Sequence, residues 1–161
     1  MDINIRSIRG SDVGEIVELM LLAFSPIYVS FRKLLGSEVY EAIWPDWRAS
    51  KRRSIQKLSQ RDGRTFAFVA EHNATIVGFI SFKLDAECRI GTLQYLAVHP
   101  DYQCEGIGTD LNAFALARMR ESGMRMAIAE TGGDTSHLPA RKSYEKSGYT
   151  GLPLVRYFRN L

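Results

Sequence analysis

The sequence lacks most of the features that mark secreted, membrane-spanning or metal-binding chains. Its two cysteines, Cys88 and Cys104, are too few for a disulfide framework and do not have the spacing of metal ligands. No apolar run reaches the roughly 20 residues that a spanning helix needs, and the first residues show no basic and apolar leader. The formal net charge of +3 is too small to indicate nucleic-acid or membrane binding. These absences favour a cytoplasmic protein with free thiols and no metal site.

Internal repeats and low-complexity segments are absent as well, and 161 residues suit one domain with one core. We therefore expect a single domain over residues 1–161. The one stretch of biased charge is residues 32–61, where eight Lys or Arg stand against three Asp or Glu. A solvated helix face explains this bias, and the alternative is a surface that meets a substrate through Tyr28, Trp44 or Trp47.

The start of the chain predicts a strand and then a helix. The strand spans residues 3–8, and Asp12 with Glu15 three positions later has the pattern of a capping box at a helix start. Apolar residues follow at helical spacing. Ser25-Pro26 is expected to end this helix, because proline removes a backbone donor and clashes with the preceding turn.

The rest of the chain alternates helices and strands. Helical spacing continues to Pro45 with an interruption at Gly36, and a further helix reaches about Gln60. Two runs rich in Phe, Val and Ile predict a hairpin with its turn at residues 72–74. In order, the remaining elements are expected as strand 65–71, strand 75–84, strand 90–98, helix 109–122, strand 124–130, helix 138–147 and strand 154–158.

The most informative segment leads from the strand 90–98 into the next helix. Gln103 is followed by Gly106 and Gly108, so a tight loop ends at a helix N-terminus. Backbone N–H groups of such a loop point the same way and the helix dipole adds partial positive charge, so the loop suits a pyrophosphate. A P-loop would need a lysine after the last glycine, and a dinucleotide fingerprint would need a third glycine where Leu111 stands.

A second motif lies downstream, where Ala140 is followed by Tyr144, Gly148 and Tyr149 in a short helix and the strand start after it. With the glycine loop, this motif resembles the GCN5-related N-acetyltransferase (GNAT) superfamily. The resemblance is close over residues 65–150 and weaker upstream. It implies the GNAT fold, an α+β architecture in which helices flank a mixed, mostly antiparallel sheet.

The resemblance also implies acetyl-CoA as the acetyl donor and assigns three regions to it. The strand before the loop would bind the pantetheine arm through its backbone, and the loop would bind the pyrophosphate. His137 takes the place of an asparagine that contacts the cofactor arm in relatives. The residues so assigned are Leu96, Ala97, Val98, Gln103, Cys104, Glu105, Gly106, Ile107, Gly108, Thr109 and His137.

Tyr144 matches the family tyrosine that protonates the leaving thiolate, and a phenol with an ordinary pKa of about 10 is protonated at neutral pH. A half-buried helix tyrosine bonded to backbone is the alternative. The carboxylate that relatives often place on the strand before the loop is missing, because Thr92 and Gln94 are uncharged. The general base therefore stays open between Glu130, Glu71, His137 and water.

The loop departs from the family pattern at Cys104 and Glu105, and a carboxylate at position 105 would weaken anion binding unless it points away. The implied function is direct acetyl transfer to a primary amine of a small molecule, a peptide or a protein, without a nucleic-acid or membrane partner. One alternative is a non-catalytic acyl-CoA sensor. The other is a nucleic-acid-associated protein, and no nucleic-acid-binding motif supports it. An exposed final strand would permit a homodimer.

Overall fold

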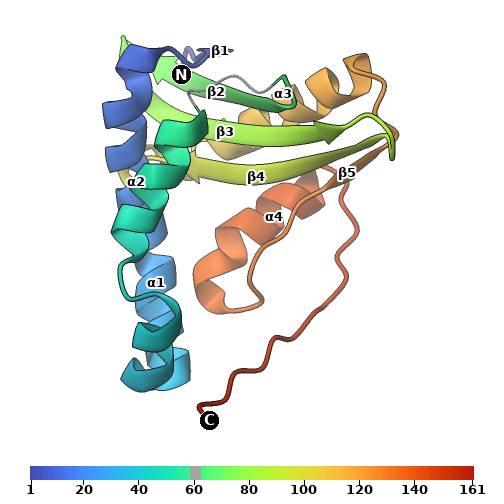
Figure 1. Cartoon of the computed structure of the whole chain (residues 1–161). Helices are drawn as coiled ribbons and strands as arrows, with labels where there is room; N and C mark the ends of the chain where they lie inside the picture. Colours follow the sequence, from blue (N-terminus) through green and yellow to red (C-terminus); the bar gives the residue numbers. More distant parts are fainter. Residues whose placement is uncertain (59–62) are drawn as a thin grey trace.

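The computed structural model describes residues 1–58 and 63–161, which form an open five-stranded sheet with helices on both faces (Figure 1). The strand order is β1-β2-β3-β4-β5, and every neighbouring pair is antiparallel except β4 and β5. This confirms the expected α+β class with a mixed, mostly antiparallel sheet. The strands are β1 (Asn4–Ser7), β2 (Thr65–His72), β3 (Thr75–Asp85), β4 (Ile90–Val98) and β5 (Met126–Ile128).

The helices of the described residues divide between the two faces of the sheet (Figure 1). α1 and α2 pack on one face, and α3 packs on the other with α4 beside it. Successive side chains of a strand point to opposite faces, so Val69 and Phe79 lie under α1 while Phe68 and Ile80 lie under α3. The helices are α1 (Val13–Ile43), α2 (Trp47–Leu58), α3 (Ile107–Glu121) and α4 (Leu138–Lys146), joined in part by the 3₁₀ turns η1 (Gly10–Asp12), η2 (Pro100–Tyr102) and η3 (Thr135–His137).

The elements from β2 to α4 lie within two residues of their expected bounds. The β2–β3 hairpin turns at Asn73 and Ala74, whose φ values of 49° and 63° belong to the two-residue turns that match strand twist. β3 is the central strand and is buried from Ile76 to Phe82. The helix end expected near Gln60 lies outside the described residues.

The prediction that Ser25-Pro26 ends the first helix is wrong. Helical backbone runs through the exposed Pro26 and breaks only at Gly36, whose φ of 78° is left-handed. The single lost backbone donor is outweighed by aromatic packing beyond the proline. After Gly36 the chain turns so that Trp44 stacks on Phe31, with ring centroids 4.9 Å apart.

Residues 10–43 are long and apolar enough to cross a bilayer by length and composition. Core helices of globular proteins meet the same criteria. On this segment Ile16 and Met20 are fully buried in the core that α1 shares with the sheet. The break at Gly36 also divides the segment, so we assign α1 to the core of the fold.

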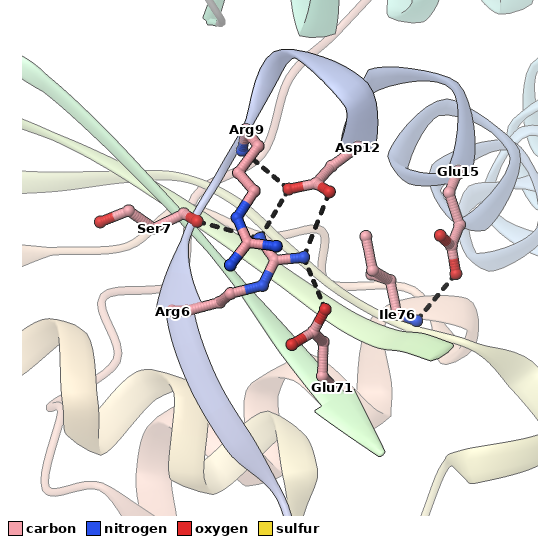
Figure 2. A network of polar contacts seen from close by, with 7 residues as sticks. All are labelled: Arg6, Ser7, Arg9, Asp12, Glu15, Glu71 and Ile76. Carbon is pink, nitrogen blue, oxygen red and sulfur yellow. Dashed lines mark hydrogen bonds and ion pairs between the residues drawn. The ribbon is translucent and has the colours of Figure 1, made fainter. Parts of the chain in front are cut away.

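The capping box expected at the start of α1 is not formed, and Asp12 instead bonds the backbone before η1. Asp12 ends η1 and makes no side-chain cap on α1, because its carboxylate accepts from the Arg9 backbone N–H at 2.7 Å. Glu15 likewise reaches away from its own helix and accepts from the Ile76 backbone N–H at 2.8 Å, as Figure 2 shows. Both carboxylates therefore join α1 to the sheet instead of capping it.

The strand expected at residues 154–158 is not formed. The C-terminal segment runs away from the sheet as an irregular chain (Figure 1), and the Leu154 and Tyr157 side chains are 80% and 89% exposed. Alternation of apolar residues indicates a strand only where a neighbouring strand supplies hydrogen-bond partners. Phe158 contacts Trp44 edge-on, with ring centroids 6.1 Å apart, so the segment meets the far end of α1.

A polar network joins β1, η1 and β2 (Figure 2). Arg6 donates to both Asp12 carboxylate oxygens, at 2.7 and 3.1 Å, and to Glu71 Oε1 at 2.5 Å. The Arg6 and Asp12 side chains are only 16% and 9% exposed, so water screens the pair weakly. The hydrogen bonds from Arg6 lower the pKa of both carboxyls.

We predict that Asp12→Asn lowers the free energy of unfolding by about 1–3 kcal/mol, because the shielded Arg6 guanidinium loses a charged partner. Folding depresses the pKa of Asp12, so its contribution is present above the ordinary carboxyl pKa of about 4 and is lost as the pH falls through the folded value. Urea unfolding at about pH 7 and about pH 3 should show a smaller difference between wild type and variant at the lower pH. The exposed Asp2 provides the control Asp2→Asn; an equal loss in both variants would contradict the prediction.

Candidate functional site

The sheet opens between β4 and β5, beside the glycine loop. β5 pairs in parallel with β4 only at Ile90, Gly91 and Thr92. On its other side, β4 stays paired with β3 as far as Val98. Among the described residues, the later part of β4 therefore has no strand on its β5 side, and its backbone groups form an open edge there.

A β-bulge lies where this opening begins. Consecutive residues of β3 pair with Leu93 and Tyr95, so Gln94 is the extra residue of β4. A bulge leaves one residue out of the ladder and changes the direction of the backbone. The expected cofactor strand, residues 96–98, follows directly, and Ala97 is only 4% exposed. Leu96 and Val98 on either side of it are half-buried.

A tight loop carries the chain from η2 into α3. Cys104 and Gly106 have left-handed φ angles of 68° and 88°, the kind of backbone that forms anion-binding nests. Gly106 is the N-cap residue of α3 and no side chain caps the helix, so the first N–H groups lack a side-chain acceptor. Gln103 Nε2 donates to the Val98 carbonyl at 3.1 Å, which fixes the loop to the end of β4.

Gly108 does not need to be glycine for the packing of the chain itself. Its φ is not left-handed, and a Cβ there would meet Val98 Cγ2 at 3.6 Å and Ser143 Oγ at 4.0 Å, which are ordinary contacts. Because glycine weakens a helix relative to alanine, a glycine that packing does not require at this position favours a ligand. Ser143 is a site residue that sequence reasoning missed: its hydroxyl is buried there with no hydrogen-bond partner among the described residues.

The other loop residues differ in what they can offer a ligand. Ile107 is 2% exposed and belongs to the core under α3, so only its backbone is available. Thr109 is half-buried, whereas Cys104 and Glu105 are exposed. Within the described residues Glu105 has no ion-pair partner, so no cation offsets its charge beside the loop.

Tyr144 projects from α4, which packs beside α3. Its ring lies against Tyr149, with centroids 5.5 Å apart. Burial raises the pKa of the Tyr144 phenol, so it is protonated at neutral pH. Its hydroxyl makes no hydrogen bond to any described residue, which leaves it available to a ligand instead of to the backbone.

His137 is part of a polar cluster that sequence reasoning missed. Its Nδ1 donates to Asp134 Oδ1 at 2.5 Å, and Asp134 Oδ2 accepts from Ser30 Oγ at 2.7 Å and from Ser136. The Phe31 ring stacks on the imidazole, with centroids 5.6 Å apart. Ser30 and Phe31 belong to α1, so the cluster joins α1 to η3. The available signal was an aspartate after a glycine pair, three positions before His137.

The Asp134 carboxyl is ionised in this cluster. Burial alone would raise its pKa, but the hydrogen bonds from Ser136, Ser30 and His137 outweigh that effect. They hold the pKa of Asp134 well below its ordinary value. An ionised carboxylate therefore faces the His137 ring, whose side chain is 11% exposed.

The structure narrows the choice of general base. Glu71 is bound to Arg6, and its strand β2 is separated from β4 by β3, so it is removed from the candidates. Glu130 follows β5, is exposed and has no ion pair within the described residues, so it remains. His137 also remains, because its Nε2 makes no hydrogen bond to a described residue.

An aromatic cluster lies between α1 and α2. Its members are Tyr28, Phe31, Tyr40, Trp44 and Trp47. The Tyr28 and Trp47 rings stack with centroids 4.0 Å apart and are 9% and 5% exposed, which makes them core residues. Trp44 is half-buried and borders a shallow depression of about 400 Å³, whose charged lining residues are Arg32, Arg48, Glu41 and Asp46.

Solved acetyltransferases share this fold. The PaiA N-acetyltransferase of Thermoplasma acidophilum, in complex with coenzyme A, has a TM-score of 0.75 and 22% identity over 93% of this chain and 91% of its own. AAC(6')-Iy, in complex with the bisubstrate analogue CoA-S-monomethyl-acetylneamine, has a TM-score of 0.70 and 15% identity over 100% and 99%. At such low identities the likeness concerns the fold alone.

Two curated relatives are mycothiol acetyltransferases from Streptomyces. That of Streptomyces bingchenggensis (strain BCW-1) is 32% identical over 83 residues, and that of Streptomyces coelicolor (strain ATCC BAA-471 / A3(2) / M145) is 30% identical over 82 residues. These alignments cover 52% and 51% of this chain, which spans about a quarter of the length of either relative (26%). Residues 36–149 match the acetyltransferase (GNAT) family, a range that includes the glycine loop and Tyr144. The chain therefore belongs to the GNAT acetyltransferase family.

Proposed function

We propose that this chain is an acetyl-CoA-dependent N-acetyltransferase that passes the acetyl group directly to a primary amine. The observation that carries the proposal is the adjacency of two stretches of backbone that the rest of the described chain leaves open. One lies along the unpaired part of β4, and the other lies at the uncapped start of α3. The first suits an extended pantetheine arm and the second a pyrophosphate. Family membership supports acetyl-CoA as the donor.

In this proposal the donor lies along residues 96–98, with its pyrophosphate at residues 103–109. A backbone N–H near the Gln94 bulge faces the thioester carbonyl. Its hydrogen bond strengthens when that oxygen becomes negative in the tetrahedral intermediate, an effect worth a few kcal/mol in acyl transfer. Holding the two reactants together supplies a further part of the rate.

Tyr144 completes the chemistry on the donor side. The neutral amine attacks the thioester carbon, and the C–S bond breaks when the intermediate collapses. The Tyr144 phenol, kept protonated by burial, donates its proton to the departing thiolate. Its unbonded hydroxyl is the observation that favours this role over a purely structural one.

The fold does not name the acceptor, and we propose a small-molecule amine. The names of the relatives support this class: AAC(6')-Iy was solved with an acetylneamine conjugate, and two relatives are mycothiol acetyltransferases. The depression beside Trp44 is of a size that admits a small ligand. The exposed free thiols of Cys88 and Cys104 fit the cytoplasmic location that we also propose.

Thiol release from acetyl-CoA tests the proposal. The panel consists of neamine, spermidine, a free amino acid, a peptide with N-terminal alanine and a lysine peptide. Release above the rate of acetyl-CoA hydrolysis with at least one amine would support an N-acetyltransferase. Binding of CoA without release for any of these amines would favour the non-catalytic acyl-CoA sensor.

A substitution in the glycine loop tests whether it binds the pyrophosphate of CoA. Gly108→Asp should weaken CoA binding at least about tenfold, because it places bulk and negative charge where the phosphates lie. The fold should tolerate the change, since a Cβ at this position meets no close contact. Calorimetric titration with CoA measures the effect. The control is Gly14→Ala, at another helix start with open space; CoA affinity retained in Gly108→Asp would show that the loop is only a turn.

Glu105 gives a second prediction, on the electrostatics of the same loop. Glu105→Lys should tighten CoA binding, because it replaces an unpaired carboxylate near the phosphates with a cation. The gain should be larger at low salt, where screening is weak. CoA affinity measured at about 0.02 M and about 0.5 M salt tests this. An affinity that equals that of wild type at both salt concentrations would mean that the side chain points away from the phosphates.

Tyr144 gives a third prediction. Tyr144→Phe keeps the ring and removes the hydroxyl that would donate the proton. The kcat should therefore fall by roughly 10²-fold or more, while CoA affinity changes little. Single-turnover thiol release measures the chemical step directly. Tyr149→Phe, which removes the hydroxyl of the neighbouring ring and its 3.5 Å hydrogen bond to Asn112 Oδ1, is the control and should keep most of the activity. Wild-type turnover in Tyr144→Phe would assign proton donation to water or another group.

A further inference from the structure

We propose that His137 is the general base of the transfer, with Asp134 as the residue that positions it. His137 Nε2 would accept the proton that the amine loses, and Asp134 would hold the ring from the opposite side. This inference rests on the proposed function and names the group that the sequence left open. It also separates His137 from the cofactor-binding role that the family resemblance implies.

The hydrogen bonds fix which ring nitrogen is the base. An ionised carboxylate can only accept, so the 2.5 Å contact with Asp134 places the proton on His137 Nδ1. The neutral ring then carries its lone pair on Nε2. This atom bonds no described residue, and the His137 side chain is 11% exposed, so Nε2 is not fully enclosed by the protein.

The loop around the pair is built for close approach. A Cβ at Gly132 would lie 2.5 Å from His137 Nδ1 and 2.8 Å from Asp134 Oδ1, so only glycine fits there. Arg141 donates to the Gly132 and Asp134 carbonyls, at 2.6 and 2.7 Å. Ser30 binds the other Asp134 oxygen at 2.7 Å. The carboxylate is thus held by His137, Ser30 and Ser136 before any ligand binds, and Arg141 fixes the backbone of its loop.

The position of the pair matches what a base for the amine requires. Phe31 covers one face of the imidazole and stacks on Trp44, the residue that borders the depression between α1 and α2. The ring is therefore continuous with the side of the molecule where we place the acceptor. α4 begins at the residue after His137 and carries Tyr144 towards the donor. Base and acid thus come from consecutive elements, one for each reactant.

The charged groups that face the imidazole are few. Asp134 and Arg141 contribute a negative and a positive charge from the loop and α4. α1 presents Ser30 and Phe31, which carry no charge, and its Arg32 is paired with Glu41 instead.

The protons balance over the acetyl transfer. The amine nitrogen forms its bond to the thioester carbon and passes its proton to His137 Nε2. The C–S bond then breaks, and the sulfur takes a proton from Tyr144. Water returns a proton to Tyr144 and removes the one on His137, so the enzyme is restored and free CoA and an amide are the products.

The first experiment reads the ring directly in the CoA-bound protein. Nitrogen-15 spectra of the side chain should show His137 protonated at Nδ1 and not at Nε2 in the neutral form. Asp134→Asn should reverse or mix the two tautomers, because an amide can donate as well as accept. Protonation of Nε2 in the neutral wild-type ring would overturn the proposal.

The second experiment measures kcat from about pH 5 to about pH 9 at saturating amine, with the panel member that releases thiol fastest. The pH dependence of kcat reports ionising groups of the bound complex. Wild-type kcat should fall on the acid side. His137→Gln should lower kcat by roughly 10²-fold and abolish the acid limb, while CoA affinity stays the same. His72→Gln, in β2 and outside the Asp134–His137 cluster, should keep both the rate and the limb.

The outcomes separate the two levels of the proposal. No thiol release by wild type with any amine would refute the proposed function itself. Release by wild type that persists, with its acid limb, in His137→Gln would refute only the base. If His137→Gln does not fold, as judged by its CoA-induced thermal shift, Asp134→Asn tests the same step and should lose most of kcat. Ser30→Ala should give a smaller loss, because it removes only one support of Asp134.

Discussion

The site depends on one feature of the sheet: among the described residues, β4 keeps its neighbouring strand on one side as far as Val98 and has none on the other side after Thr92. Backbone groups at such an edge need partners from water or from a ligand. They lie next to a helix start that no described side chain caps, so two stretches of open backbone meet in one region. β3, buried from Ile76 to Phe82, holds β4 in place without help from β5.

The parts of this arrangement that could be predicted from the sequence are those with local signals. The β2–β3 hairpin, the glycine loop and α3 each depend on residue types within a few positions of one another, and their bounds were close to those expected. Gly36 was likewise expected to interrupt the helix, because glycine readily adopts the left-handed φ that it has. The spacing of Tyr144 after Ala140, which helped to identify the family resemblance, is also a local signal.

The rest was decided by contacts between distant segments. Pro26 does not end α1, because aromatic residues farther along pack onto the same core. Asp12 turns to Arg6 and Arg9 instead of capping α1. No local pattern pairs Ser30 with Asp134, which lie 104 positions apart, and the apolar segment near Leu154 has no strand beside it. Each of these outcomes needs the tertiary structure, since the deciding partner lies elsewhere in the chain.

The break at Gly36 divides the two halves of the site in a way that bears on how such proteins diversify. Ser30, which supports the Asp134 carboxylate, precedes the break and belongs to the part of α1 that packs on the sheet. Trp44 and the charged rim of the depression follow it, apart from Arg32. Under the proposed function, changes in the length or composition of residues 37–46 would therefore reshape the wall that faces the acceptor, while the proposed catalytic pair His137 and Asp134 keeps its place. A lineage can in this way exchange one acceptor for another and inherit the chemistry unchanged.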